Sequence, residues 1–318
     1  MIYDTIIIGG GPTGSSAAIY AARKQMKAVL ITEEFGGQSV VSNDIDNWIG
    51  DVRLSGFELA QKFEKHVKAQ EGLEIITGDR ATEITKVDSD TSYPVYQVTT
   101  GSGKVFQAKT LILGMGAHRK KLGIPGEEEF NAKGVAYCAT CDAPFFGGMK
   151  VAVVGGGNAG LESAWDLCAY ADEVYLFNRS GALKGDPATA ERVKAHEKFK
   201  GVLYNTVVTE VYGEGMVKGV KWKNTETGET GDMELQGLFI EIGSAPNSGM
   251  VADLVELNAY NEVVIDHKYS STSAPGIFAA GDLTDEAYKQ NNISAGDAVK
   301  AALSAYTYVS ELENEKHK

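Results

Sequence analysis

The chain has 318 residues, 43% of them hydrophobic and 23% charged, a profile typical of a soluble globular protein long enough for two domains. Its net charge of −13 argues against nucleic acid or an anionic membrane as a partner, because both attract basic surfaces. The apolar runs are strand-sized and the N-terminus lacks the features of a secretion signal, so we expect no transmembrane helix and a cytoplasmic location.

The first segment predicts a dinucleotide-binding unit. TIIIGGGPTGSSAA, beginning at Thr5, is a β-branched run followed by Gly9, Gly11 and Gly14 in a GxGxxG pattern and then by helix-forming residues. Such glycines allow a tight turn and a close approach to a pyrophosphate, which the helix N-terminus attracts. AVLITEEF predicts a second strand, and Glu33 at its end is placed to hold a ribose hydroxyl.

The stretch AYCATCDAPFF contains a CxxC pair, Cys138 and Cys141, followed by Asp142. A zinc site would need about two more ligands, and the five histidines are scattered, so we expect no metal. Two buried small residues would leave Asp142 unexplained, although an acid in a turn is common. In a reducing compartment the pair favours redox catalysis. The third cysteine, Cys168, lies in a helical run and is expected in the core.

A second GxGxxG turn follows the cysteine pair. VAVVGGGNAGLESA repeats the first pattern with Gly155, Gly157 and Gly160, at an offset of 146 residues. Two copies, each between a strand and a helix, argue against a glycine turn without a ligand. No carboxylate follows the next strand, where Arg179 is placed for a 2′-phosphate and favours NADP, although a solvated loop arginine explains it equally well.

The remaining pattern predicts one domain inserted into another. Strands lead to a crossing point at Gly116, and GLFIEIGSAPN leads to a second crossing at Gly243. GIFAAGDLTD then predicts a strand followed by Gly281 and Asp282, and a helical pattern from Ser294 returns to the first domain. A nicotinamide delivers two electrons and a disulfide accepts two, and a flavin can pass them between these partners.

The sequence resembles the low-molecular-weight thioredoxin reductases and the flavoprotein portion of the alkyl hydroperoxide reductase flavin subunit. The resemblance covers nearly the whole chain and rests on GGGPTG, GGQ with NWIG, YCATCDAP, GGGNAGLESA, PGIFAAGD and YKQ. We expect no thioredoxin-like domain before the flavin domain, which argues against a full-length hydroperoxide reductase subunit. The resemblance implies an α/β protein with two Rossmann-like domains: an FAD-binding domain of residues 1–116 and 245–318, and an inserted pyridine-nucleotide-binding domain of residues 117–244 that carries the cysteine pair.

The resemblance also implies roles for individual residues. Cys141 would face the flavin, Cys138 would attack the disulfide of a thioredoxin-like protein, and Asp142 would supply a proton. A homodimer is implied as well. The implied FAD contacts are Gly9, Gly11, Gly14, Glu33, Gln38, Asn47, Gly281, Asp282 and Gln290. The implied NADP contacts are Gly155, Gly157, Gly160, Arg179 and Lys184.

The chain departs from the family where the coenzyme phosphate would bind. NADPH-dependent members carry a pattern like HRRxxFR, and here the aligned stretch is NRSGALK, with Asn178, Arg179 and Lys184 at the first, second and last positions. We therefore predict only a weak preference for NADPH over NADH. Asn291 and Asn292 replace residues that are usually small or apolar near the flavin, where they could alter its potential or its access to solvent.

We predict a thioredoxin reductase that moves electrons from NADPH through FAD to a thioredoxin-like protein. An enzyme of the same fold with a different donor or acceptor is the alternative, either with ferredoxin as the donor or with NADH and a peroxiredoxin system. A non-catalytic flavin redox sensor is a third hypothesis. The complete CxxCD motif and both glycine turns argue against the sensor.

Overall fold

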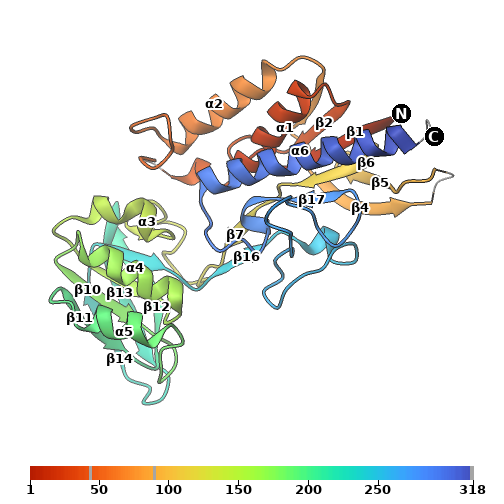
Figure 1. The fold of residues 1–318 in the computed structure, drawn as a ribbon. Helices are drawn as coiled ribbons and strands as arrows, with labels where there is room; N and C mark the ends of the chain where they lie inside the picture. Colours follow the sequence, from red (N-terminus) through yellow and green to blue (C-terminus); the bar gives the residue numbers. More distant parts are fainter. Residues whose placement is uncertain (43–44, 89–90, 316–318) are drawn as a thin grey trace. The chain divides into compact units, whose positions relative to one another are not determined.

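The computed structural model describes residues 1–42, 45–88 and 91–315, and the chain divides into two compact units (Figure 1). Unit 1 comprises Met1–His118 and Ala245–Lys318, and unit 2 comprises Arg119–Ser244. Both units are built on parallel sheets with helices, which confirms the predicted α/β class. After Gly116 the chain continues as a short strand, β7 (Ala117–Arg119), that pairs with β16 (Ser244–Pro246).

Unit 1 is organised around a seven-stranded sheet with the order β3-β2-β1-β6-β5-β4, in which β17 also pairs with β6. β1, β2, β3, β6 and β17 run parallel, whereas β4 and β5 form antiparallel pairs. β6 is long enough to pair with β5 along its first half and with β17 along its second half. The strands are β1 (Ile2–Ile8), β2 (Ala28–Thr32), β3 (Leu73–Thr77), β4 (Ala81–Val87), β5 (Val95–Thr100), β6 (Val105–Leu113) and β17 (Ile277–Ala279).

Three α-helices cover this sheet: α1 (Pro12–Arg23), α2 (Gly56–Lys68) and α6 (Asn291–Glu315). α1 begins with a proline, which lacks an N–H group at a position where that group would have no partner within the helix. At the start of α2, Ser55 and Glu58 form a capping box in which each side chain accepts a hydrogen bond from the backbone N–H of the other. α1 and α6 lie side by side in Figure 1, and small residues let them approach closely. The buried alanines at this contact are Ala17, Ala18, Ala21, Ala298, Ala301, Ala302 and Ala305.

Unit 2 has a five-stranded parallel sheet with the order β11-β10-β9-β15-β8 and a separate antiparallel sheet with the order β12-β13-β14. The strands of the first are β8 (Val135–Ala136), β9 (Lys150–Val154), β10 (Glu173–Phe177), β11 (Phe199–Leu203) and β15 (Gly237–Ile240). Those of the second are β12 (Thr206–Glu214), β13 (Met216–Asn224) and β14 (Thr230–Glu234). The helices are α3 (Ala139–Asp142), α4 (Asn158–Cys168) and α5 (Pro187–Lys194).

Close backbone packing joins the first strand of each unit to the helix that follows it. A Cβ atom on Gly14 would lie 1.6 Å from the carbonyl oxygen of Gly9, and one on Gly160 would lie 2.0 Å from that of Gly155. Only glycine fits at these two helix positions, because the obstructing atom is backbone and cannot rotate away. No helix in the described part of the chain has an apolar stretch sufficient to span a bilayer.

Replacing Gly14 with alanine should destabilise unit 1, because the added methyl group overlaps the carbonyl oxygen of Gly9. Overpacking of this kind costs roughly 1–3 kcal/mol or more. Gly296 of α6 is the matched control, since it is also helical but its Cβ would meet nothing within 4 Å. Gly296→Ala should stabilise by about 0.5–1 kcal/mol through helix propensity. Urea unfolding followed by circular dichroism should therefore give midpoint shifts of opposite sign, and equal shifts would contradict the packing argument.

Candidate active site

The first glycine turn forms a backbone cradle at the end of β1. Gly9 has a φ of +111°, and a Cβ there would lie 2.2 Å from the carbonyl oxygen of Gly114, so packing requires glycine at this position. At Gly11, in contrast, the nearest atom to an added Cβ is 3.8 Å away. The middle glycine therefore leaves an open approach to the backbone at the start of α1, which fits a pyrophosphate and which a side chain would occupy.

Two further predicted residues lie at this turn. Gly281, with a φ of +75°, comes so close to the start of α1 that a Cβ would lie 2.4 Å from the Thr13 hydroxyl oxygen, and Asp282 follows it. Glu33 follows β2 directly, and its carboxylate is 66% exposed with Arg80 at 3.9 Å. The structure thus places Gly281 and Asp282 beside the glycine turn, with Glu33 at the end of the neighbouring strand.

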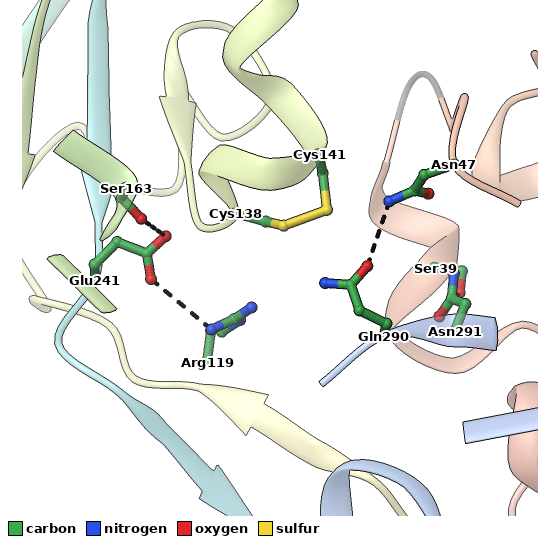
Figure 2. Close-up of a disulfide and its surroundings, with 9 residues drawn as sticks. All are labelled: Ser39, Asn47, Arg119, Cys138, Cys141, Ser163, Glu241, Gln290 and Asn291. Atoms are coloured by element: carbon green, nitrogen blue, oxygen red, sulfur yellow. Dashed lines mark hydrogen bonds and ion pairs between the residues drawn. A yellow bond between two sulfur atoms is a disulfide. The ribbon is translucent and has the colours of Figure 1, made fainter. Parts of the chain in front are cut away.

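The other predicted flavin contacts lie in two segments: Gln38 and Asn47 follow Gly36, and Gln290 directly precedes α6. Gln38 is exposed in a short 3-10 helix, and the Asn47 side chain donates a hydrogen bond of 3.4 Å to the Gln290 side chain (Figure 2). Asn47 and Gln290 are 243 residues apart in the sequence, so their proximity is a product of the fold.

The structure gives Asn291 and Asn292 a role that sequence reasoning did not find. The Ser39 hydroxyl donates to the Asn291 side chain at 3.2 Å. Asn292 donates to the Asn47 carbonyl oxygen at 2.7 Å and accepts from the Ile49 backbone N–H at 3.3 Å. The two amides therefore tie Ser39, Asn47 and Ile49 to the first turn of α6. In the sequence, the only signal at Asn291 and Asn292 was that they replace residues that are usually small or apolar in the family.

The glycine turn of unit 2 repeats this geometry. Gly155 has a φ of +136°, and a Cβ there would lie 2.2 Å from the Glu241 carbonyl oxygen, whereas an added Cβ at Gly157 would meet nothing within 4 Å. As in unit 1, the first glycine is required by packing and the middle glycine leaves the backbone open. Gly155, Gly157 and Gly160 thus form a second cradle that fits a dinucleotide phosphate.

The loop after β10 is shaped by Asn178. This residue is only 4% exposed, and its side-chain N–H group donates to the carbonyl oxygens of Ser180 at 2.7 Å and Ala182 at 2.9 Å. The Lys184 backbone N–H donates to the Gly156 carbonyl oxygen at 2.7 Å, so the loop folds back onto the glycine turn. The side chains of Arg179 and Lys184 are exposed on this loop.

Cys138 and Cys141 form a disulfide at the start of α3, with their Cα atoms 5.3 Å apart (Figure 2). The backbone N–H groups of Cys141 and Asp142 both donate to the Cys138 carbonyl oxygen, at 3.2 and 3.0 Å, and this closes the turn. Both cysteines are half-buried. Cys168 is buried as expected, and burial raises the pKa of its thiol to about 11, which keeps it unreactive.

Aromatic packing fixes the disulfide turn to the sheet. The Phe146 ring, which follows α3 closely, packs edge-on against Phe239 of β15 with ring centroids 4.8 Å apart. Gly237 makes room for it, because a Cβ there would lie 2.5 Å from the Phe146 ring. Ala139 and Ala143 are buried in the same cluster. The turn is therefore held on a rigid element, as a reactive pair requires.

Asp142, directly after the disulfide, is a carboxyl group with an altered acidity. Burial raises its pKa from the usual value near 3.8 to about 6, because the low-dielectric surroundings disfavour the charged form. The group is therefore about half protonated at pH 6 and largely protonated at lower pH, where it can donate a proton.

Sequence reasoning missed one buried carboxylate in this site, Glu241. It directly follows β15, and it hydrogen-bonds with Ser163 and forms an ion pair with Arg119 (Figure 2). The available signal was a glutamate immediately after a continuous apolar strand, where a charge is unexpected. Among the residues that the structure describes, no group of three or more His, Cys, Asp or Glu side chains could hold a metal ion.

Comparisons with known proteins agree with this geometry. The family model described as pyridine nucleotide-disulphide oxidoreductase matches residues 3–302. The chain is 41% identical over 307 residues to a Staphylococcus aureus subunit of alkyl hydroperoxide reductase, and 39% identical over 307 residues to an NADH dehydrogenase of Bacillus subtilis. Each alignment covers 96% of this chain but only 59% and 58%, respectively, of those relatives.

Solved structures agree over the full length of the fold. Thioredoxin reductase from Streptococcus pyogenes has a TM-score of 0.87 and 34% identity, with 98% of this chain and 99% of that chain covered. Thioredoxin reductase from Giardia duodenalis also has a TM-score of 0.87, with 29% identity and coverage of 97% and 99%. Since the family model spans nearly the whole chain, this protein belongs to the pyridine nucleotide-disulphide oxidoreductase family.

Proposed function

We propose that this protein is a thioredoxin reductase. It would carry two electrons from a reduced pyridine nucleotide, through FAD and the Cys138–Cys141 disulfide, to the disulfide of a thioredoxin-like protein. The observation that carries the proposal is the CATCD disulfide in the same unit as a glycine turn with an open middle position. The likeness to thioredoxin reductase structures at up to 34% identity supports it.

FAD would bind in unit 1, where it supplies an acceptor and donor of two electrons. The open backbone at Gly11 would receive its pyrophosphate, and the exposed Glu33 carboxylate would hold a ribose hydroxyl. The Asn47–Gln290 contact fixes two amides that would bind the flavin portion. The full set is Gly9, Gly11, Gly14, Glu33, Gln38, Asn47, Gly281, Asp282 and Gln290.

The two cysteines would have separate roles. The Cys138 thiolate attacks one sulfur of the partner disulfide, and the other partner sulfur leaves with the electron pair and takes a proton that Asp142 supplies. The Cys141 thiolate then attacks Cys138 in the mixed disulfide, which releases the second partner sulfur and re-forms the Cys138–Cys141 bond. Cys141 would also be the residue that the flavin reduces.

The pyridine nucleotide would bind at the second glycine turn, through Gly155, Gly157 and Gly160. We propose a weak preference for NADPH, since Arg179 and Lys184 offer positive charge and Asn178 adds no carboxylate to repel a 2′-phosphate. NADH is the second candidate, because one relative is an NADH dehydrogenase and others are alkyl hydroperoxide reductase subunits. In that case the acceptor would belong to a peroxiredoxin system.

We further propose that the enzyme acts in the cytoplasm as a homodimer. A dithiol reductase needs a compartment where thiols are kept reduced. The homodimer rests on the family resemblance, and sedimentation equilibrium of the purified protein tests it.

Trapping experiments separate the two cysteines. Cys141→Ser should accumulate a mixed disulfide with oxidised thioredoxin through Cys138, because the enzyme thiol that resolves it is missing; alkylation with iodoacetamide blocks the freed thioredoxin thiol, which would otherwise reverse the step. Cys138→Ser should form none. Cys168→Ala is the control and should turn over normally, since that thiol is buried and unreactive. Mass spectrometry of the reduced variants after mixing with thioredoxin checks this. Trapping by Cys138→Ser alone would reverse the assignment, and trapping by neither would contradict the proposed function.

The raised pKa of Asp142 predicts a pH dependence with a definite sign. The donor is the protonated form, so its contribution should be complete well below pH 6, half-maximal near pH 6, and should fall further as pH rises. Proton donation contributes about 10²-fold or more, so wild type should exceed Asp142→Asn by roughly a hundredfold at low pH. The measurement is the single-turnover rate of the reduced protein with oxidised thioredoxin.

Taking the ratio of wild-type and variant rates removes the pH dependence that both share through their thiols. This ratio should decline about tenfold per pH unit above 6. Asp172→Asn is the matched control, because it makes the same change at an exposed turn of unit 2, and its ratio should stay flat. A flat ratio for Asp142→Asn would exclude it as the donor.

Coenzyme choice is tested by Arg179→Ala. A charge-assisted contact to a phosphate is worth roughly 1.5–3 kcal/mol, and the incomplete motif suggests the low end, so the KM for NADPH should rise about tenfold while that for NADH stays unchanged. Lys200→Ala, which removes an exposed charge elsewhere in unit 2, should change neither. Equal losses with both coenzymes would show that Arg179 does not contact the phosphate. Turnover with reduced ferredoxin alone would identify a different donor.

A further inference from the structure

Glu241 connects the two functional turns of unit 2. Its carbonyl oxygen lies against Gly155, where a Cβ would come within 2.2 Å, so its backbone packs directly on the dinucleotide turn. Its side chain is only 6% exposed and points toward the disulfide turn and α4 (Figure 2). A buried carboxylate is rare without a compensating role, because taking the charge out of water is unfavourable.

Three donors surround this carboxylate. The Ser163 hydroxyl donates to one oxygen at 2.9 Å, and the Arg119 guanidinium lies 3.9 Å from the other. The backbone N–H of Ala139, the residue after Cys138, lies near enough to lower the pKa of this carboxyl. Burial is the largest influence and, with the nearby Asp142 carboxyl, it raises the pKa of Glu241, whereas the three donors oppose this shift by favouring the ionised form. The charged groups that face Glu241 are thus Arg119 of β7 and Asp142 of α3.

Ala139 lies between the two cysteines in the sequence, so the influence of its backbone on Glu241 places the carboxylate near the disulfide turn. Reduction of the Cys138–Cys141 bond adds two electrons, and uptake of one proton leaves one thiol and one thiolate. A carboxylate held at this turn disfavours the thiolate, because like charges repel in a partly desolvated site. A dithiol whose reduced form is less stable is the stronger reductant.

We propose that Glu241 is a positioning residue of the dithiol, which ties the disulfide turn to the dinucleotide-binding sheet and opposes negative charge on the reduced cysteines. The proposal rests on the proposed function, which makes Cys138 and Cys141 the redox pair. It gives a buried acid at the end of an apolar strand a task that matches a reductase: to keep the pair ready to lose electrons.

Glu241→Gln tests the charge while preserving the shape of the side chain. The holoenzyme is reduced with dithiothreitol, without any nicotinamide or thioredoxin, and the rate of iodoacetamide labelling of each cysteine is measured by mass spectrometry from pH 5 to 9. The apparent pKa of the reactive cysteine should fall by about one unit, a tenfold increase in thiolate at low pH. In redox buffers of reduced and oxidised dithiothreitol, the equilibrium between the Cys138–Cys141 disulfide and its dithiol should shift up to tenfold toward the dithiol.

Three further variants separate charge from packing. Ser163→Ala removes a donor that favours the ionised carboxylate. It should lower the apparent pKa of the reactive cysteine and favour the protein dithiol, as Glu241→Gln does, but by only roughly two- to threefold. Glu241→Asp keeps the charge and should stay near wild type. Glu162→Gln is the matched control, because it removes an exposed carboxylate next to Ser163 in α4. It should change neither the apparent pKa of the reactive cysteine nor the redox equilibrium.

The outcomes are distinct. Unchanged labelling and redox equilibria in Glu241→Gln would overturn the proposal even if turnover fell, since a purely structural residue would give that result. If Glu241→Gln does not fold, Ser163→Ala decides, and no shift there overturns the proposal. Because neither measurement uses a nicotinamide or a protein substrate, a shift in an enzyme that cannot reduce thioredoxin would refute the proposed function alone.

Discussion

The contact between backbone and backbone at the two glycine turns is the constraint on which the site depends. At Gly14 and Gly160 the helix comes so close to the preceding strand that no side chain fits. This closeness sets the direction in which α1 and α4 leave their sheets, and it leaves the middle glycine of each turn open. In unit 2 the same packing brings the carbonyl oxygen of Glu241 against Gly155, so the dinucleotide turn and the disulfide turn share one strand, β15.

The disulfide turn gains its rigidity from that strand. Phe146 packs on Phe239 over the space left by Gly237, and Glu241, which accepts a hydrogen bond from Ser163, lies near the Ala139 backbone. The reactive pair is thus fixed by an aromatic contact on one side and an ionic network on the other. Burial raises the pKa of both Asp142 and Glu241, and Arg119 is the cation that faces Glu241.

Local pattern predicted the elements of this fold well, because its signals are short. Both GxGxxG turns, the alternation of strands and helices, and the CxxC pair are each contained within about a dozen residues, and the structure and the family match confirm the α/β class. Contacts between distant segments left no such trace. Ser163 and Glu241 are separated by 78 residues, and Ser39 and Asn291 by 252. Asn178 was misjudged for a different reason. Its alignment with a coenzyme-binding position suggested an exposed residue, but its side chain is buried and its hydrogen bonds shape the loop.

The division of the chain has a consequence for its synthesis. Unit 2 is a single continuous segment, 119–244, so all of its contacts exist once that segment has left the ribosome. Unit 1 needs β17 beside β6 and α6 beside α1, and the bonds from Asn291 to Ser39 and from Asn292 to Asn47 can form only at the end. Domains generally fold as units during translation, and contacts distant in sequence form slowly. The inserted unit 2 should therefore fold first, and the sheet of unit 1 should be completed only after β17 and α6 have been synthesised.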